Sequence, residues 1–356
     1  MKKIQVGIIG TGFGANVHAP IFGLYEGFEV KAITSDYRGR ANGTLRDIDV
    51  NNIYTDWNEM LEKEELDLVS IASSPNYHYE MTLASINKNI HVLCEKPMGI
   101  NSTQTLKMLE AQRTTNVMGF VNFQWRLTPV RLKIKEILRN KELGEIQYIK
   151  YHGSFSSYEN LTSQYRGWEG RRKEGGGLLF AVGSHMIDSL MWWMDQQITD
   201  VYADLKTIVP VYYGIDGIEE RDSEDAFTVI GHFQNGVSFT ADLFYPALRG
   251  NGWELEIYGT KGSLIMNNDK DIKISFGGDF YKITIEGQEV PSQLPAPANQ
   301  YFNGLYPMVD LIYKSIVNHK VYPDIPTFID GHQVQMVMDA IYQSAINKTI
   351  ARVNNK

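Results

Sequence analysis

The first residues in the chain whose types and spacing could bind a ligand are glycines. They lie in the segment Gly10-Thr11-Gly12-Phe13-Gly14-Ala15, which fits the pattern G-x-G-x-x-[GA]. Glycines at these places permit a tight turn and let the backbone approach a pyrophosphate at the N-terminus of the next helix. Because the segment follows a short apolar run and opens a helix-length stretch, we predict that it binds the pyrophosphate of a dinucleotide.

The end of the second predicted strand should decide which dinucleotide binds. A carboxylate there accepts hydrogen bonds from the adenosine ribose of NAD, whereas basic residues pair with the 2′-phosphate of NADP. Ser35 occupies this position and is followed by Asp36, Arg38 and Arg40. Asp36 favours NAD, Ser35 with Arg38 favours NADP, and the two arginines could equally lie in a solvated loop. The choice between NAD and NADP therefore stays open.

Two further polar segments follow predicted strands and should face the same crevice, since open α/β sheets bind ligands beyond the carboxyl ends of their strands. Taken alone, a lysine at position 96 is more often a surface residue. Pro97, however, favours a rigid bend that would aim the Lys96 ammonium into the crevice. The candidate cofactor-binding residues in the two segments are Ser73, Pro75, Asn76, His78, Glu95 and Lys96.

The elements that must position these residues alternate in the first third of the chain. Short β-rich apolar runs at residues 4–9, 30–34, 68–72, 91–94 and 117–121 predict buried parallel strands. Helix-length segments lie between them near 15–24, 57–63, 78–87 and 102–113, the last capped by Asn101 or Ser102. This alternation predicts an α/β domain, a parallel sheet with helices on both faces.

The pattern changes after residue 129. A helix at 130–139, a strand at 146–155 and a helix at 183–194 precede a strand-rich stretch from 201 to 285. Gln234-Asn235-Gly236 predicts a hairpin, 259–262 predicts another turn, and together they favour an antiparallel sheet. The apolar spacing of 330–346 predicts a helix that packs on one of the domains. We expect domains at 1–124 and 125–356, with a hinge and a cleft near residues 122–130.

Composition limits the class of protein. A length of 356 residues is typical of about two domains, and 43% hydrophobic with 21% charged residues is typical of globular chains. The net charge of −8 disfavours nucleic acid and anionic membranes as partners. The single cysteine, Cys94, excludes an internal disulfide. Without an apolar run long enough to cross a membrane or a convincing leader segment, we interpret the protein as cytoplasmic.

These residues resemble the Gfo/Idh/MocA family, the glucose-fructose oxidoreductase, inositol dehydrogenase and MocA oxidoreductases. The resemblance covers nearly the whole chain. It rests on the glycine-rich loop, on Pro75-Asn76-Tyr77-His78 and most specifically on Glu95-Lys96-Pro97 after a strand ending His-Val-Leu-Cys. Residues 122–129 resemble the crossover into the family's second domain, and 175–177 through 183–188 its catalytic helix.

The resemblance implies an N-terminal Rossmann domain and a C-terminal α+β domain with a large open, mostly antiparallel sheet. It implies hydride transfer between NAD or NADP and a hydroxyl-bearing carbon of a sugar, sugar derivative or cyclitol. Lys96 would stabilise the developing alkoxide, and His185 would accept the hydroxyl proton. The exposed sheet face commonly mediates oligomer contacts in this family, which implies a homo-oligomer, a dimer or tetramer.

One position departs from the family pattern. Many members carry an aspartate four residues before the catalytic histidine, and here that residue is Ala181. Either His185 and Lys96 suffice, or another carboxylate such as Glu174 substitutes, or the protein binds cofactor without turning over such substrates. Taken without the family, His185 is more often a helix histidine that bonds locally or pairs with Asp188. These two residues do not complete a metal coordination sphere, so we predict no metal site.

The segment before the predicted catalytic helix is rich in aromatic and arginine residues, which suit polyol recognition. A folded loop with solvated arginines is an equally good interpretation. The candidate substrate-binding residues are Asn122, Tyr158, Trp168, Arg171 and His185.

Three functions follow from this pattern. The leading hypothesis is an NAD(P)-dependent dehydrogenase acting on CH–OH groups. A second keeps the fold but uses a tightly held cofactor for transient oxidation of a sugar. The third is a non-catalytic sensor in which cofactor and metabolite occupancy control a partner, an idea that Ala181 motivates.

Overall fold

The computed structural model describes residues 3–34, 52–215 and 217–353. The chain forms two compact units. Unit 1 comprises Met1–Thr128 and Gly287–His332, and unit 2 comprises Pro129–Glu286 and Gln333–Lys356. Unit 1 therefore includes a segment that the sequence-based boundary after residue 124 assigned to the second domain.

A six-stranded parallel sheet forms the centre of unit 1, in the order β3-β2-β1-β4-β5-β6. This order reverses between β1 and β4, the place where sheets of this kind bind their ligands. The five predicted strands are present, and β3 is a sixth that the sequence did not indicate. The strands are β1 (Ile4–Ile9), β2 (Phe28–Thr34), β3 (Asn52–Tyr54), β4 (Leu68–Ile71), β5 (His91–Cys94) and β6 (Gly119–Val121).

The helices of unit 1 begin where the local sequence supplies a cap or a proline. Asn101 accepts a hydrogen bond from the Gln104 N–H at 2.9 Å and begins α5, as predicted, and Pro75 is the first residue of α4. None of the helices in the described ranges has the length and apolarity to cross a bilayer. The helices are η1 (Gly14–His18), α1 (Ala19–Leu24), α3 (Trp57–Lys63), α4 (Pro75–Asn87), α5 (Ser102–Arg113), η2 (Gln124–Leu127) and α9 (Ala298–Asn318).

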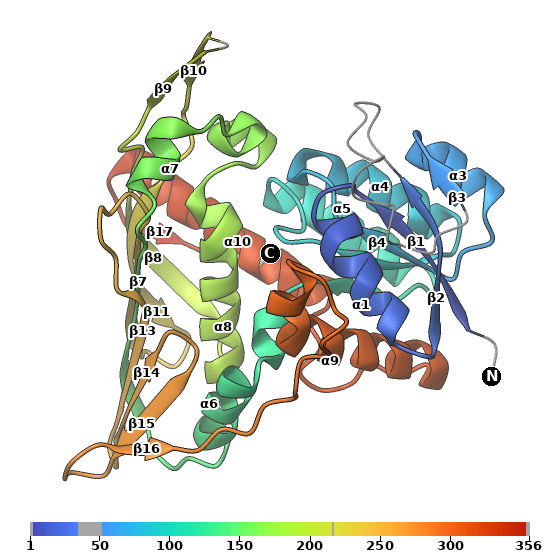
Figure 1. The fold of residues 1–356 in the computed structure, drawn as a ribbon. Helices are drawn as coiled ribbons and strands as arrows, with labels where there is room; N and C mark the ends of the chain where they lie inside the picture. Colours follow the sequence, from blue (N-terminus) through green and yellow to red (C-terminus); the bar gives the residue numbers. More distant parts are fainter. Residues whose placement is uncertain (1–2, 35–51, 216, 354–356) are drawn as a thin grey trace. The chain divides into compact units, whose positions relative to one another are not determined.

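Helix α9 belongs to unit 1 although it lies far from the other elements in sequence. It packs against α1 (Figure 1) and against η2. Phe302, Leu305 and Met308 of α9 join the same core cluster as Phe22 and Phe28. The sequence analysis indicates no element here, and the structure adds a helix that packs on α1 and η2, with Tyr301 near its start against Phe13 of the glycine-rich loop and Tyr313 against Phe28 at the start of β2.

A nine-stranded sheet forms unit 2, in the order β16-β15-β14-β13-β7-β12-β11-β8-β17. Every neighbouring pair is antiparallel except β7 and β12, which run parallel. The hairpin predicted at Asn235-Gly236 joins β11 to β12, and the turn predicted at 259–262 joins β13 to β14. The strands are β7 (Ile146–Ser154), β8 (Ile198–Lys206), β11 (Ala226–Phe233), β12 (Ser238–Phe244), β13 (Gly252–Gly259), β14 (Ser263–Asn267), β15 (Asp271–Ser275), β16 (Tyr281–Ile283) and β17 (Ala351–Arg352). The predicted large, mostly antiparallel sheet is confirmed.

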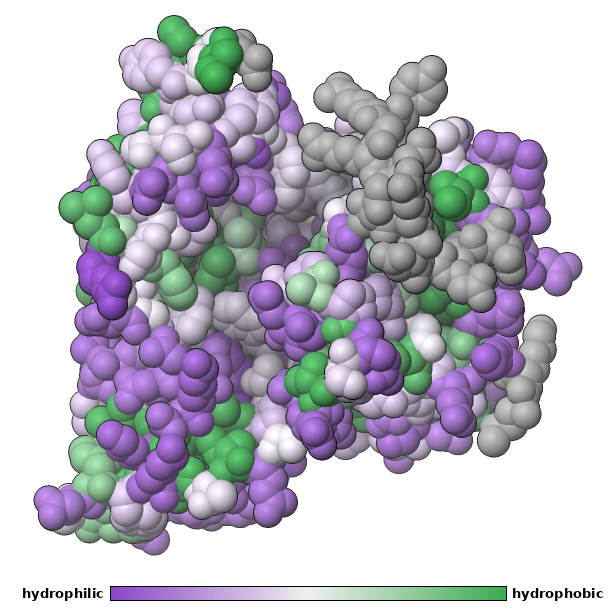
Figure 2. Space-filling model, in the orientation of Figure 1, coloured by the Kyte–Doolittle hydropathy of each residue, from purple (hydrophilic) through white to green (hydrophobic). Residues whose placement is uncertain are grey.

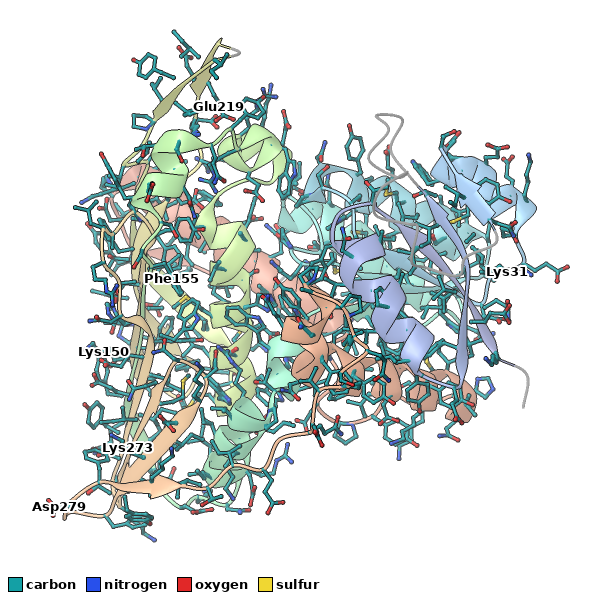
Figure 3. All side chains as sticks on the ribbon, viewed as in Figure 1. Lys31, Lys150, Phe155, Glu219, Lys273 and Asp279 are labelled. Carbon is teal, nitrogen blue, oxygen red and sulfur yellow. The ribbon has the colours of Figure 1, made fainter. Side chains whose placement is uncertain are left out.

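Helices cover one side of this sheet, where Figure 1 shows α6 (Pro129–Arg139), α8 (Ser184–Met194) and α10 (Phe328–Asn347). Side chains of β7 alternate between buried and partly exposed, and Lys150 and Lys273 lie on the side away from the helices (Figure 3). Arg131 of α6 ties the helix layer to β7, because its guanidinium donates to the hydroxyl of Tyr151 and pairs with Asp269 at 2.9 Å.

A separate hairpin, β9 (Val211–Gly214) with β10 (Gly217–Glu220), projects from unit 2 (Figure 1). Apolar side chains lie at its end (Figure 2), where Tyr213, Ile215 and Ile218 are largely exposed. Its base is held firmly, because the buried Glu219 accepts from the backbone N–H groups of Arg166 and Gly167 at 3.1 and 2.7 Å (Figure 3).

Candidate active site

The glycine-rich loop connects β1 to η1, and its three glycines meet different surroundings. Gly10 has a φ of +124°, and a Cβ there would lie 2.3 Å from the carbonyl oxygen of Ala72. A Cβ on Gly14 would lie 3.0 Å from Ile8 Cγ2. A Cβ on Gly12 would meet no atom of the described residues within 4 Å. Gly10 and Gly14 therefore serve the packing of the loop on the sheet, and Gly12 leaves the open backbone that a pyrophosphate requires.

The two residues between the glycines of this loop make different contacts. Thr11 presents its carbonyl oxygen to Asn16 Nδ2 at 3.4 Å. Phe13 packs edge-on against His18 and Tyr301, with ring centroids 5.2 and 4.8 Å apart. Because the Phe13 ring packs against His18 and Tyr301, we expect a ligand at this loop to contact the backbone rather than the Phe13 side chain.

The residues expected to discriminate NAD from NADP follow β2. Thr34 is the last described residue of that strand. Ser35 and Arg38, with Asp36 and Arg40, lie outside the described residues. The fit of the site to a dinucleotide therefore rests on the glycine-rich loop and on the segments after β4 and β5.

The segment after β4 is locked to the segment after β5 by a buried histidine. The two ring nitrogens of His78 face the carbonyl oxygens of Ser73 and Pro97 at 3.0 and 2.8 Å. Burial lowers the pKa of His78 even though both carbonyl contacts act to raise it, so the neutral ring donates to one carbonyl at a time. His78 was predicted to bind cofactor, and the structure shows its ring joining two loops.

Two neighbours of His78 come from the same predicted set. Pro75 is buried at the start of α4. Asn76 follows it, and its buried Oδ1 has no hydrogen-bond partner among the described residues. A buried acceptor of this kind is satisfied in most proteins, so Asn76 has the capacity to accept one hydrogen bond from a ligand.

Glu95 and Lys96 end β5 at the same edge of the sheet. Glu95 is buried, accepts from the Lys96 N–H at 3.1 Å and lies 3.0 Å from His18 Nε2. Asn122, predicted to bind substrate, is fully buried and donates through Nδ2 to the same carboxylate. Sequence reasoning missed His18, although a polar residue inside the apolar stretch that follows Gly14 is a signal that could have identified it.

The second predicted catalytic residue lies in unit 2. His185 is buried in α8, and its carbonyl oxygen accepts from the Ser189 hydroxyl at 2.7 Å. Ala181 lies one helical turn earlier in η5 (Leu179–Gly183) and is exposed. The position where many family members carry aspartate thus presents a methyl group. Glu174, the suggested substitute, pairs with Arg171 at 3.1 Å.

A different carboxylate holds the start of this helix. Buried Glu224 accepts from the Leu179 N–H at 2.8 Å and from the Tyr342 hydroxyl at 3.0 Å. Burial raises the pKa of Glu224 despite these bonds. The guanidinium of Arg172 stacks on the Tyr342 ring at 3.9 Å. Glu224 therefore positions the helix that carries His185, and no local sequence pattern indicated it.

We expect Glu224→Gln to stabilise the protein at neutral pH and Glu224→Ala to destabilise it. Since the folded-state pKa of Glu224 lies above its ordinary value of 4.5, its contribution is complete below that pH and is lost as the pH rises through the folded-state pKa. Glutamine stays neutral and can satisfy both Leu179 and Tyr342. Alanine leaves them unpartnered, at a cost of about 1–3 kcal/mol each.

Thermal unfolding of the three proteins between about pH 4 and about pH 8 checks this expectation. The advantage of the glutamine variant should grow as the pH rises and should vanish at the acidic end. A glutamine variant that melts below the wild type at neutral pH would contradict the assignment.

The segment before the helix carries the remaining predicted substrate residues. Tyr158 lies in α7 (Tyr158–Ser163) and Trp168 in η3 (Gly167–Gly170), and both rings are more than one third exposed. Buried Arg221 fixes the segment by donating to the carbonyl oxygens of Leu161 and Gln164. The two rings are thus presented on a well-anchored loop. Within the described ranges, no cluster of three His, Cys, Asp or Glu residues could hold a metal ion.

Comparison with known proteins gives two matches to family models. A model described as an oxidoreductase family with an NAD-binding Rossmann fold matches residues 4–123, and one described as a GFO/IDH/MocA C-terminal domain matches residues 132–265. The first match lies within unit 1 and the second within unit 2.

Several characterised proteins are similar along their whole length. Levoglucosan dehydrogenase of Pseudarthrobacter phenanthrenivorans is 24% identical over 388 residues, which cover 98% of each chain. Glucose-6-phosphate 3-dehydrogenase of Bacillus subtilis is 26% identical over 366 residues, which cover 98% of this chain and 97% of the relative. A solved structure of levoglucosan dehydrogenase in complex with NADH and levoglucosan matches 100% of each chain with a TM-score of 0.88 at 21% identity. This likeness shows that the fold is the same.

Proposed function

The chain belongs to the Gfo/Idh/MocA family of NAD-binding oxidoreductases, and from this premise we propose that it is an NAD(P)-dependent dehydrogenase of a sugar, sugar derivative or cyclitol. The reaction moves a hydride between the nicotinamide and a carbon that bears a hydroxyl group. Relatives named as sugar and cyclitol dehydrogenases, among them myo-inositol 2-dehydrogenase of Thermotoga maritima, support this class of substrate.

The observation that carries the proposal is the edge of the unit 1 sheet. The open backbone at Gly12 follows β1, and Lys96 follows β5. These two strands lie on either side of the point where the strand order reverses. Such an edge suits a dinucleotide whose pyrophosphate lies on the glycine-rich loop. The bound nicotinamide supplies a carbon that accepts the hydride.

The roles of the protein's own residues follow from the chemistry of alcohol oxidation. The substrate C–H bond breaks with its electron pair leaving as hydride, and the O–H bond breaks with its proton going to His185, since imidazole titrates near neutral pH. The Lys96 ammonium stabilises the negative charge that develops on the oxygen. Tyr158, Trp168 and Arg171 contribute stacking and hydrogen bonds to a polyol.

Titration of the protein with NADH and NADPH, followed by nicotinamide fluorescence, tests the first half of the proposal. The preferred oxidised cofactor is then added to a panel of sugars and cyclitols, and absorbance of the reduced nicotinamide is recorded. We expect saturable binding and substrate-dependent reduction. A protein that binds neither NADH nor NADPH would refute the proposal.

Ala181 favours one alternative, a cofactor-binding sensor without turnover. That function predicts tight binding of NADH or NADPH, no reduction across the panel and a stably copurifying partner. A tightly held cofactor used for transient oxidation predicts instead that NAD(H) remains bound through purification. Steady formation of reduced nicotinamide from free cofactor would exclude both.

A further inference from the structure

A buried polar cluster in unit 1 is not used by the chemistry described so far. It consists of His18, Ser70, Glu95 and Asn122, and three of these side chains are fully inaccessible to solvent while Glu95 is 7% exposed. His18 Nδ1 lies 2.6 Å from the Ser70 hydroxyl oxygen, and His18 Nε2 lies 3.0 Å from Glu95 Oε1. Polar groups buried to this degree are costly unless each has a partner, so their assembly at one place calls for a physical reason.

The cluster joins the carboxyl ends of three neighbouring strands to the helix after the glycine-rich loop. His18 ends η1, Ser70 lies in β4, and Glu95 and Asn122 follow β5 and β6. His18 and Asn122 both contact the Glu95 carboxylate, and Ser70 joins the cluster through His18. Any change at that carboxylate is therefore transmitted to the segment that bears Lys96.

Donor and acceptor chemistry fixes the state of the cluster. An ionised carboxylate can only accept hydrogen bonds, so Asn122 must turn Nδ2 toward it and His18 must carry its proton on Nε2. His18 Nδ1 can then accept from the Ser70 hydroxyl. Burial acts to raise the pKa of Glu95, but the hydrogen bonds from His18 and Asn122 and the charge of Lys96 outweigh it and lower the pKa. The carboxylate is thus a buried negative charge.

Lys96 is held on both sides by this arrangement. Its N–H donates to Glu95 Oε2 at 3.1 Å. On its other side, the carbonyl oxygen of Pro97 lies 2.8 Å from His78 Nδ1. The titratable groups that face Glu95 are His18, Lys96, His78, Cys94 and Tyr301, and of these only Lys96 and the histidines can carry positive charge.

We propose that Glu95, held in place by His18 and Asn122, is a positioning residue that fixes the Lys96 backbone and keeps the Lys96 side chain in its ammonium form. This inference rests on the proposed function for its catalytic consequence, because only an ammonium stabilises an alkoxide. A half-buried amine would otherwise lose its proton more readily than an exposed one, since removal from water disfavours the charged form. We expect the negative charge of the Glu95 carboxylate, which accepts from the Lys96 backbone N–H, to oppose that tendency.

Competitive labelling of the cofactor-free protein with acetic anhydride tests the proposal without relying on turnover. The extent of acetylation of Lys96 is measured by peptide mass spectrometry as the pH is varied, with the exposed residues Lys88 and Lys107 as internal references. In the wild type, we expect the labelling midpoint of Lys96 to lie at or above the midpoints of the references. A midpoint clearly below them would overturn the proposal, and this comparison requires no variant.

The variant Glu95→Gln removes the charge and keeps the shape of the side chain. We expect the Lys96 midpoint to fall by about one pH unit, and Lys107→Gln serves as the matched surface control. In a turnover assay, kcat should fall by a larger factor than KM rises. The pH above which activity is lost because Lys96 has lost its proton should shift downward together with the labelling midpoint. An unchanged Lys96 midpoint in a folded Glu95→Gln protein would contradict the inference.

The two proposals fail in different ways. If no sugar is oxidised but the Lys96 midpoint still falls in Glu95→Gln, the dehydrogenase function is refuted while the effect of Glu95 on Lys96 stands. If sugars are oxidised and the midpoint does not move, the function stands and the role given to Glu95 is wrong.

Discussion

Lys96→Met is expected to reduce kcat by about 10²- to 10³-fold while the affinity for the reduced cofactor changes little. Methionine has a similar length and keeps the packing of the stem, but it cannot place a positive charge beside the developing alkoxide. The backbone around residue 96 is held by Glu95 and by the contact of His78 with Pro97. Loss of the ammonium should therefore leave the local fold intact.

His185→Ala should have a comparable effect through a different step, because removal of a general base typically costs about 10²- to 10⁴-fold. The defect should lessen as the pH rises, since hydroxide and deprotonated substrate replace the missing base. Wild-type turnover should fall on the acid side, where the imidazole is protonated and cannot accept a proton.

Steady-state kinetics with the preferred cofactor, together with fluorescence titration, measure both effects. Lys107→Met and His232→Ala are matched controls, since both residues lie exposed at the surface. The controls should retain wild-type kcat. If Lys96→Met and His185→Ala turned over substrate as fast as the controls, neither residue would have the proposed role.

The second large effect concerns the glycine-rich loop, where two alanine substitutions should separate folding from binding. Gly10→Ala should lower Tm by about 5 °C or more, because its φ of +124° is strained for alanine and the new Cβ would lie 2.3 Å from the carbonyl oxygen of Ala72. Gly12→Ala should leave Tm close to that of the wild type, since its Cβ would meet no atom within 4 Å in the part of the chain that the structure describes.

Cofactor affinity, unlike Tm, should be reduced in the Gly12→Ala variant. The Cβ of Gly12→Ala would occupy the space through which a pyrophosphate approaches the backbone, so we expect the Kd for NADH or NADPH to rise about tenfold or more, which corresponds to ~1.4 kcal/mol. Gly23→Ala is a suitable control, because a Cβ there also meets no described residue within 4 Å and Gly23 lies inside α1.

Differential scanning fluorimetry and fluorescence titration on the same preparations separate these outcomes. Normal cofactor affinity in Gly12→Ala would mean that the pyrophosphate does not approach this loop. A Gly10→Ala protein as stable as the wild type would show that the loop can relax away from Ala72.

Much of the parallel-sheet unit was predictable from local pattern. The runs at 4–9, 68–72 and 91–94 are mostly apolar because these strands are largely buried, and each became a strand. The antiparallel sheet was predictable where a turn is encoded by neighbouring residues, as at Asn235-Gly236. Strand β3, with three residues of mixed polarity, carries too weak a pattern to be recognised.

The residues of the candidate site likewise fall into those that the local sequence identified and those that it did not. Gly10, Gly12 and Gly14 were identifiable because a turn that needs glycine is a local requirement. Arg131, Arg221 and Glu219 gave no signal, since charged residues are ordinarily exposed and only distant partners make their burial tolerable. Glu224 is likewise separated by 45 residues from the Leu179 N–H that it caps.

The sequence by itself therefore determined the two-part architecture, the glycine-rich loop after β1 and the position of Lys96 at the end of a strand, because each depends on residues that are neighbours in the chain. Tertiary structure alone decided that α9 packs on α1 and η2 of unit 1 and that His18 lies against Glu95. His18 and Glu95 are 77 residues apart, and Glu95 and Asn122 are 27 residues apart. Their side chains meet only because parallel strands bring their carboxyl ends to one edge of the sheet, where a buried carboxylate must gather its donors from whichever elements surround it.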